Sequence, residues 1–481
     1  MAALTGPRVP GNRVGGTNAA APRVPFGTVD EVSRHWLRDA EPETVHIEVH
    51  LPGRLDPGRL RHAFAEALRR HPGVLRREVS GRWYRRRYAW EVTPDPDVDP
   101  VHFPPPGPDA LALARKRALA DCPPLSASPP LRLEVVEPGP DAGGSVLVLT
   151  LHHTALDAPT GLRLLATTAE VYGGVTDGPA AAPARPRPRP GKPEALPPSP
   201  RGRPARITPD TSAAGTDRPA PGRPAPDGTA DAAGDGMLLA ELPVPARPPR
   251  APDGTAPYTV NDQLLVAASL MVARWNRLHG VPDRPVWLNM PVDDRTNGPL
   301  MPMGNGTRLL RVPVCPQDPA DVTLLAAATP DPEAVTRLLR QTAHRTQALK
   351  SAPPVPPLGP GGALLTLPVL PVGVRRAVAR TVRRAGASRA STLLVSNLGR
   401  VAYPLDFGDG GRSRAVWFSG PARRPSGASL TLTSTGNRLH TALRWSRALF
   451  DDTAAARLNE LFARSLDLTS WRDPAPHRSR T

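Results

Sequence analysis

A proline-rich segment in the middle of the chain limits what the chain can fold into. Residues 179–236 hold 15 prolines in 58 positions and almost no large apolar side chains. Such a segment buries too little apolar surface to offset the entropy cost of ordering it, so we expect a disordered or polyproline linker. The linker predicts two folded lobes, 26–178 and 237–470, with a disordered leader at 1–25 and a disordered tail at 471–481.

The charge and the cysteine content exclude several classes of protein. The 481 residues carry 61 basic and 44 acidic side chains, a formal net charge of +17. This charge favours contact with phosphates, an acidic partner or an anionic surface. Two cysteines, Cys122 and Cys315, are too few for a disulfide scaffold or a cysteine-rich zinc site, and they fit a reducing, cytoplasmic setting. We expect no signal peptide, and no stretch reaches the ~20 apolar residues that span a membrane.

Strand and helix patterns interleave in both lobes, so the expected fold class is α/β, in the mixed α+β sense. Alternating apolar residues mark strands, and Asp56 before Pro57 marks a helix start, as does the capping box of Thr28 and Glu31. The expected strands are 45–51, 83–92, 131–136, 146–151, 237–242, 286–290, 307–314, 393–396, 415–419, 429–435 and 439–445. The expected helices are 28–37, 57–70, 159–172, 259–279, one or two within 322–347, 374–389 and 452–466.

The most informative stretch is 146–161, VLVLTLHHTALDAPTG. An apolar strand ends in His152 and His153, Asp157 follows, and a helix begins soon after. Because side chains alternate along a strand, one histidine should face a cleft and the other the body of the fold. A neutral imidazole suits proton abstraction at about pH 7. The alternative is a pair of core histidines with Asp157 as a helix N-cap, and a metal site would need a third ligand that the neighbouring sequence does not offer.

Several blocks, in a fixed order, resemble one enzyme superfamily. HHTALDAPTG resembles the HHxxxDG signature of the thioester-dependent acyltransferases. These include nonribosomal peptide condensation domains, wax-ester synthase/diacylglycerol acyltransferases, polyketide-associated acyltransferases, and chloramphenicol and carnitine acyltransferases. Other blocks of the superfamily are similar to LPGRLDPGRLRHAFAEALRRHPGVLRREV at 51–79, PPLSASPPLRLEVVE at 123–137, TVNDQLLVAA at 259–268, VDDRTNGPLMPMGNG at 292–306 and VSNLGR at 395–400. The resemblance covers nearly the whole chain outside the leader, linker and tail.

The resemblance implies a role for each matching residue. His153 matches the catalytic general base, and His152 matches the less essential first histidine. Asp157 matches an aspartate that points away from the substrate and pairs with an arginine. Arg295, ten residues before Asn305, matches that arginine. The alternative for Arg295 is a solvated side chain, one among the 58 arginines of the chain.

One position departs from the superfamily pattern. Ala158 stands where the superfamily has glycine. Alanine weakens the site if that glycine needs an unusual backbone angle or lends its amide to the oxyanion. The departure favours an alternative function, a catalytically weak or inactive scaffold that binds a carrier protein or a partner enzyme.

The resemblance also implies a fold and a class of substrates. We expect two chloramphenicol-acetyltransferase-like lobes in a V-shaped pseudo-dimer, with a tunnel between them. The acyl donor would be a thioester on CoA or on the phosphopantetheine arm of a carrier protein, and the acceptor would be a hydroxyl or an amine. No bound cofactor, metal or acyl-enzyme is implied, and we expect a monomer that binds no nucleic acid. The residues expected to line the tunnel are Thr160, Asn305, Ser396 and Asn397, although Ser396 and Asn397 equally fit a turn.

Two basic segments are candidate surfaces. Residues 374–389, VRRAVARTVRRAGASR, predict an amphipathic helix with Val374, Val378 and Val382 on one face. Such a helix fits an acidic carrier protein, CoA phosphates or an anionic membrane surface. We favour an ordinary exposed helix that packs on the fold by its valine stripe. Residues 83–88, WYRRRY, fit an edge strand with outward arginines better than a nucleic-acid site.

Overall fold

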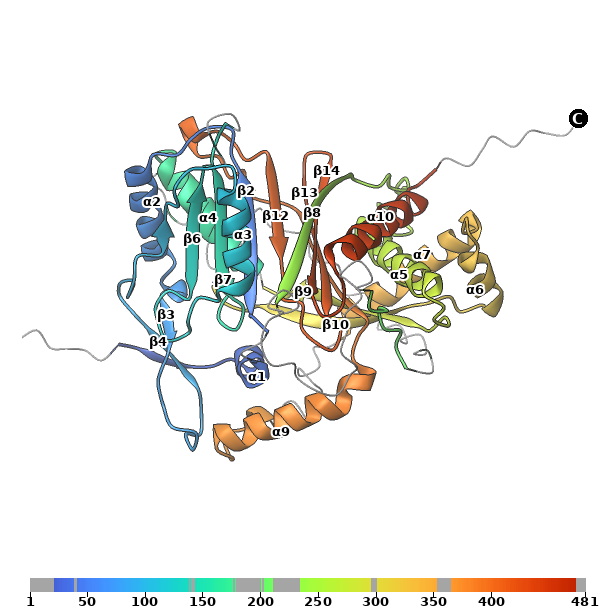
Figure 1. Cartoon of the computed structure of the whole chain (residues 1–481), viewed down its shortest axis with the longest axis horizontal. Coiled ribbons are helices and arrows are strands. Elements are labelled where there is room, and N and C mark those ends of the chain that lie inside the picture. The colour runs from blue at the N-terminus through green and yellow to red at the C-terminus, as the bar shows by residue number, and fades with distance from the viewer. Residues whose placement is uncertain are drawn as a thin grey trace, which may run out of the picture.

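Four strands from the first half of the chain and one from the second half build a five-stranded sheet. The computed structural model (Figure 1) describes residues 21–38, 41–137, 139, 143–175, 178, 200, 203–210, 234–295, 301–352 and 365–472. The strand order is β12-β2-β7-β6-β5, with β6 and β5 parallel and the other pairs antiparallel. The strands are β2 (Thr44–His50), β5 (Val101–His102), β6 (Leu131–Val136), β7 (Val146–His152) and β12 (Ala415–Ser419). Every residue of β7, the central strand, is buried, so both faces of the sheet need cover.

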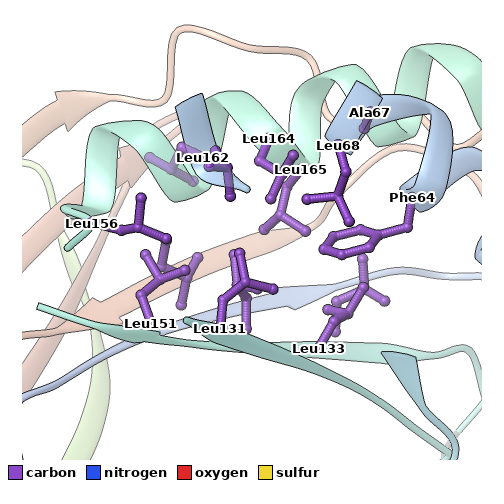
Figure 2. Close-up of a cluster of buried hydrophobic side chains, with 14 of the residues drawn as sticks. Phe64, Ala67, Leu68, Leu131, Leu133, Leu151, Leu156, Leu162, Leu164 and Leu165 are labelled. Atoms are coloured by element: carbon purple, nitrogen blue, oxygen red, sulfur yellow. The ribbon is translucent and has the colours of Figure 1, made fainter. Parts of the chain in front are cut away.

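Helices provide that cover on both faces. α2 (Pro57–Arg70) and α4 (Ala158–Tyr172) pack on one face, and α3 (Ala110–Ala120) packs on the other. Figure 2 shows the first of these cores, in which Phe64 and Leu68 of α2 meet Leu165 of α4 above the strand leucines. A Cβ at Gly161 would lie 2.6 Å from Cδ1 of Ile47, so glycine lets α4 approach the sheet closely. This packing holds β7 in place, and with it the histidines at its end.

The second half forms a six-stranded sheet with its own apolar core. The strand order is β10-β9-β11-β13-β14-β8, in which β11 runs parallel to both of its neighbours. α5 begins at the capping box of Thr259 and Asp262, and packs beside α7 and α10. The strands are β8 (Asp235–Pro243), β9 (Val286–Asp293), β10 (Thr307–Val314), β11 (Leu393–Arg400), β13 (Ala428–Thr435) and β14 (Arg438–Ser446). The helices are α5 (Val260–Leu278), α6 (Pro319–Ala326), α7 (Pro332–Ser351) and α10 (Asp452–Leu468).

A strand that crosses between the halves joins them. β12 lies within the segment 237–470 expected to form the second lobe, yet it pairs with β2 of the first sheet. On its way it also contacts the second sheet, because the hydroxyls of Thr431 and Thr433 on β13 donate to carbonyl oxygens of β12. The boundary expected at the linker therefore does not separate two independent sheets. β12 covers backbone groups of β2 that an edge strand would leave unpaired.

Parts of the predicted leader, linker and tail are packed. β1 (Arg23–Pro25) pairs with β4 (Ala89–Val92), which also pairs with β3 (Arg76–Glu78), so ordered structure begins before Phe26. Ala205 and Ile207 are buried in the core of the second half. The linker prediction missed them because the average composition of 58 residues hides single apolar positions. The Trp471 N–H donates to the Ala246 carbonyl oxygen. The remainder of these expectations, at 1–20, 179–199, 201–202, 211–233 and 473–481, lies outside the described residues.

Two local expectations are wrong, both around helix α9 (Val372–Ala385). α1 (Thr28–Trp36) is capped by Gly27 without a side-chain bond, and Glu31 instead forms an ion pair with Arg375 of α9. Residues 83–88 form a turn rather than an edge strand, because the Trp83 carbonyl oxygen accepts a hydrogen bond from the start of α9. The mixed α/β class is confirmed. The pseudo-dimer and its tunnel stay predictions.

Candidate active site

β7 brings the two histidines to the end of the first sheet. His152, its last residue, pairs with Thr44 of β2 and is 6% exposed, whereas His153 leaves the strand and is half-buried. The His153 N–H donates to the Glu43 carbonyl oxygen at 2.7 Å, which continues the pairing by one residue. The two neighbouring rings therefore differ in exposure, as the alternation of a strand predicts.

His152 is a buried neutral histidine. Burial lowers the pKa of His152 to about 4, against the opposing pull of the Glu43 carboxylate. Its Nδ1 accepts a hydrogen bond from the Thr154 N–H at 3.1 Å, so the ring proton lies on Nε2. This ring shapes the turn that follows the strand, which suits a packing role.

His153 carries the ring suited to proton transfer. Its Nδ1 lies 3.4 Å from the Leu156 carbonyl oxygen, which can only accept. Nδ1 therefore holds the ring proton and Nε2 keeps a lone pair, which no hydrogen bond within the described part of the chain engages. Burial and the nearby Arg423 guanidinium lower the pKa of His153, so the imidazole is neutral at neutral pH.

Asp157 and Arg295 form the ion pair that the resemblance implies. Asp157 Oδ2 lies 2.9 Å from Arg295 Nη2, and the two side chains are 3% and 7% exposed. Asp157 Oδ1 also accepts from the Thr160 N–H at 3.1 Å, so Asp157 is the N-cap of α4 as well. Arg295 holds a second carboxylate, Asp293, at 2.9 Å. Burial opposes the charge on Arg295, but the two carboxylates outweigh it and raise its pKa.

The loop before β10 fastens the second half of the chain to the turn after the histidines. Asn305 Nδ2 donates to the carbonyl oxygens of His153 (3.1 Å) and Thr154 (2.8 Å). The Thr160 hydroxyl donates to the Gly304 carbonyl oxygen at 2.8 Å and accepts from the Gly304 N–H at 3.1 Å. Thr160 and Asn305, expected in a tunnel wall, thus join the two halves beside the histidines.

Gly306 completes this fastening. Its N–H donates to Asp157 Oδ2 at 3.0 Å. A Cβ at Gly306 would lie 2.2 Å from Cδ and Nε of Arg295, so a side chain there would displace the guanidinium. The glycine in the sequence GNG therefore has a steric reason in this chain.

Sequence reasoning missed one ion pair beside the histidines. Glu43, buried before β2, accepts two hydrogen bonds from Arg423 Nε, at 2.7 and 2.9 Å. Burial alone would raise the pKa of Glu43, but Arg423 outweighs burial and holds it below its usual value. The two residues are 380 positions apart, and neither lies in a recognisable pattern, so no local signal pairs them.

The departure at Ala158 costs no backbone strain. Ala158 is the first residue of α4 and is buried. Leu405 is the one non-glycine residue with a positive φ among the described residues, so Ala158 lies outside the region that favours glycine. The first of the two concerns that the sequence raised about this alanine therefore does not apply.

Ser396 and Asn397 lie in β11. The Asn397 side-chain oxygen accepts from the Gly399 N–H at 2.8 Å, beside a bulge in the pairing with β13. Both residues pair with β13, so they form a strand with a bulge and not the turn that the alternative interpretation predicted. Hydrogen bonds among the described residues do not link either side chain to His153.

The remaining reactive groups give little chemistry. Burial raises the pKa of the Cys122 thiol to about 12, which makes it a poor nucleophile at neutral pH. In the part of the chain that the structure describes, no three His, Cys, Asp or Glu residues are grouped to hold a metal ion. Nor does any described helix combine the length and apolar character that crossing a membrane requires.

Comparison with known proteins places this geometry in context. No family model matches the chain. Two proteins of Mycobacterium tuberculosis, Rv2305 of strain H37Rv and MT2362 of strain CDC 1551, are each 30% identical to it over 387 residues. The match covers 78% of this chain and 83% of each relative, and both relatives are named as uncharacterized.

Solved structures share the fold at low sequence identity. The first condensation domain of the CDA synthetase has a TM-score of 0.57 at 16% identity, covering 96% of this chain and 98% of that one. A mutant starter condensation domain of rhizomide synthetase RzmA, in complex with C8-CoA and Leu-SNAC, has a TM-score of 0.57 at 15% identity, covering 92% and 93%. A wax ester synthase/diacylglycerol acyltransferase from Marinobacter aquaeolei VT8 has a TM-score of 0.52 at 12% identity, covering 92% and 98%. The chain therefore belongs to the same protein family as Rv2305, and it shares its fold with these condensation domains and with the wax ester synthase/diacylglycerol acyltransferase.

Proposed function

We propose that the chain is an acyltransferase that moves an acyl group from a thioester to a hydroxyl or amine, with His153 as general base. The donor would be carried on CoA or on the phosphopantetheine arm of a carrier protein. The observation that carries the proposal is the state of the His153 ring. Its proton lies on Nδ1, its lowered pKa keeps it neutral, and Nε2 retains a lone pair.

The proposed reaction needs no covalent enzyme intermediate. Nε2 of His153 takes the proton of the acceptor hydroxyl or amine while that nucleophile bonds to the thioester carbonyl carbon. The resulting tetrahedral oxyanion collapses, the carbon–sulfur bond breaks, and the imidazolium returns its proton to the departing thiolate. The products are an ester or amide and a free thiol, and the histidine ends neutral as it began.

Asp157, Arg295 and Asn305 would act as positioning residues. Asp157 caps α4 and is held by Arg295, while Asn305 holds the backbone of the histidine turn. The nitrogen of a general base must lie within about 3 Å of the oxygen or nitrogen that gives up the proton. A loosely held turn would therefore lower the reaction rate even though the base is still present. The alternative scaffold function rested on Ala158, and the helical backbone at that residue removes the concern about an unusual backbone angle.

A donor panel with thiol release as the readout tests the proposal. Octanoyl-CoA is the first donor to try and an aminoacyl thioester the first amine acceptor, because the RzmA neighbour is in complex with C8-CoA and Leu-SNAC. Long-chain donors with alcohol acceptors follow from the wax ester synthase neighbour. His153→Ala should lower turnover roughly 10²–10⁴-fold. The matched control, His62→Ala, changes an exposed histidine of α2 and should leave the rate unchanged.

Full turnover in the His153→Ala variant would overturn the assignment of the base. A wild type that releases thiol from no donor, yet binds an acyl carrier protein, would replace the acyltransferase by the scaffold function.

A further inference from the structure

Helix α9 carries an exposed apolar face, which reverses the expected packing of this helix. Val374, Val378 and Val382 are 38%, 42% and 51% exposed, although the sequence predicted that these valines pack on the fold. The segment leading into α9 continues the exposed face. Leu365 at its start is buried, but the next three large apolar side chains, Leu367, Val369 and Leu370, are 47%, 75% and 48% exposed. Single exposed apolar side chains are ordinary, but a continuous row of them on one helix face is not.

A buried arginine explains the reversal. Arg375 is 1% exposed and forms an ion pair with Glu31 of α1, which is also buried. Arg375 also donates to the Arg86 carbonyl oxygen. Val372 and Ala379, on the same side of the helix as Arg375, are buried with it. Because this side is held by charge and hydrogen bonds, the adjoining face that carries the valines is left in solvent.

A second element extends the same surface. The turn between β3 and β4 carries Trp83 and Tyr84, which are 67% and 54% exposed. It is fixed to the start of α9 by backbone hydrogen bonds from Gly373 to the Trp83 carbonyl oxygen (2.9 Å) and from Val372 to the Arg85 carbonyl oxygen (2.8 Å). Figure 1 shows this turn and α9 at the same edge of the molecule. We name this surface the apolar rim. It consists of Leu367, Val369, Leu370, Val374, Val378, Val382, Trp83 and Tyr84.

The two segments that form the apolar rim carry side-chain charges of one sign, and Glu78 and Glu41 beside them pair with Arg85 and Arg383. The sequence contains no aspartate or glutamate in 79–90 or in 365–390. Exposed arginines flank the apolar residues on both elements, namely Arg82, Arg86, Arg87, Arg380 and Arg384. This is the composition that a surface of negative charge over an apolar interior would bind.

We propose that the apolar rim docks the protein on an anionic phospholipid surface. Tryptophan and tyrosine rings prefer the interface between headgroups and acyl chains, and an amphipathic helix lies in that plane with its apolar face inward. Arginines at the edge of the face meet the lipid phosphates, each strengthening binding about fivefold. An acidic protein surface would match the arginines, but it would leave six aliphatic and two aromatic side chains without apolar cover. This inference is independent of the acyl-transfer proposal.

Vesicle co-sedimentation of the full-length protein tests this docking. The wild type should bind vesicles of phosphatidylcholine with phosphatidylglycerol, and should bind vesicles of phosphatidylcholine alone much less. Its binding to the anionic vesicles should weaken as the salt concentration is raised above roughly 0.15 M. The triple variant Val374→Ser, Val378→Ser, Val382→Ser should lower the partition coefficient by tenfold or more, on the order expected for removing buried valine area. The double variant Arg380→Gln, Arg384→Gln should lower it by about 25-fold, or fivefold for each arginine.

A matched control separates this surface from general stickiness. Leu278→Ser with Leu309→Ser removes two side chains that are 69% and 55% exposed elsewhere on the chain, and it should leave binding unchanged. Far-UV circular dichroism and a thermal melt should show that every variant is folded. Trp83 also reports directly, because its emission should shift to the blue on vesicles and the shift should be lost in Trp83→Phe.

Several results would overturn the proposal. Equal binding by wild type and the folded triple variant would remove the apolar rim from the interaction. Equal binding to neutral and anionic vesicles would remove the role of the arginines. Binding of an acyl carrier protein, with no binding to vesicles, would assign the surface to a protein partner. A wild-type dimer that the triple variant abolishes, again without vesicle binding, would assign it to a second copy of the chain.

Discussion

The Asp157–Arg295 pair offers the sharpest test of how the histidine turn is held. Both side chains are almost fully buried and meet at 2.9 Å. Removing one partner of a buried pair leaves an uncompensated charge and costs ~3–5 kcal/mol. Asp157→Ala also removes the N-cap of α4, worth ~1 kcal/mol.

The two single variants should not be equivalent. After Asp157→Ala, Arg295 keeps the Asp293 carboxylate at 2.9 Å, so its charge stays compensated. After Arg295→Ala, Asp157 keeps only the N–H groups of Thr160 and Gly306, and Asp293 loses the guanidinium and keeps the backbone N–H of residue 295. Apart from the loss of the N-cap in Asp157→Ala, we therefore expect Arg295→Ala to lower the free energy of unfolding more than Asp157→Ala does. The double variant should lose less than the sum of the singles, by ~1–3 kcal/mol.

Equilibrium urea unfolding of the four proteins, followed by circular dichroism, measures this coupling. A matched cycle on Arg464 and Glu460 provides the control, because both side chains are 66% exposed and lie one helical turn apart. That surface pair should couple by only ~0.3–0.5 kcal/mol. If the buried pair is additive within ~0.5 kcal/mol, the argument that Asp157 and Arg295 act as one unit is refuted.

Three further predictions follow from the site and the linker. His153→Ala should leave the thermal transition nearly unchanged while it lowers acyl transfer, whereas His152→Ala should lower stability more than the chemical step. Because the pKa of His152 falls from 6.5 to about 4 on folding, only the unfolded chain binds its proton in that range. Stability should therefore fall as the pH drops from 6.5 to 4, by up to ~3 kcal/mol for this group, and His152→Asn should flatten the dependence. Excising 211–233 should leave the thermal transition unchanged, whereas Ile207→Ser should lower it, because Ile207 is buried.

Local sequence rules predicted most elements because their signals lie within one turn or one strand. Asp56 caps α2, as its place before Pro57 indicates, and α5 lies within the predicted range 259–279. The strand 307–314 occurs as predicted, since its apolar alternation is local. Arg295 could be matched to Asp157 only through the resemblance, because 138 residues separate them.

The failures at α9 and at the start of α1 share one cause, which is that a distant partner overrode a local pattern. The valine stripe of α9 predicts a buried face, but Arg375 binds Glu31, 344 residues away, and turns that stripe outward. Glu31 is thereby unavailable for the capping box that its spacing from Thr28 predicts. β12 likewise carries no local sign of whether it will join the first sheet or the second.

The candidate site is built from both halves of the chain, and this governs how its geometry is maintained. The first half supplies His153 on the end of β7, but a half-buried ring after a strand end has little of its own to fix it. Asn305 and Arg295, from the β9–β10 connection, hold that turn through its carbonyl oxygens and through Asp157. Relative movement of the two sheets would therefore be transmitted to the Nε2 atom of His153. Because β12 pairs with β2 and bonds to β13, it limits that movement. Strand β12 and the β9–β10 connection therefore both help to keep the proposed base, His153, in a fixed position.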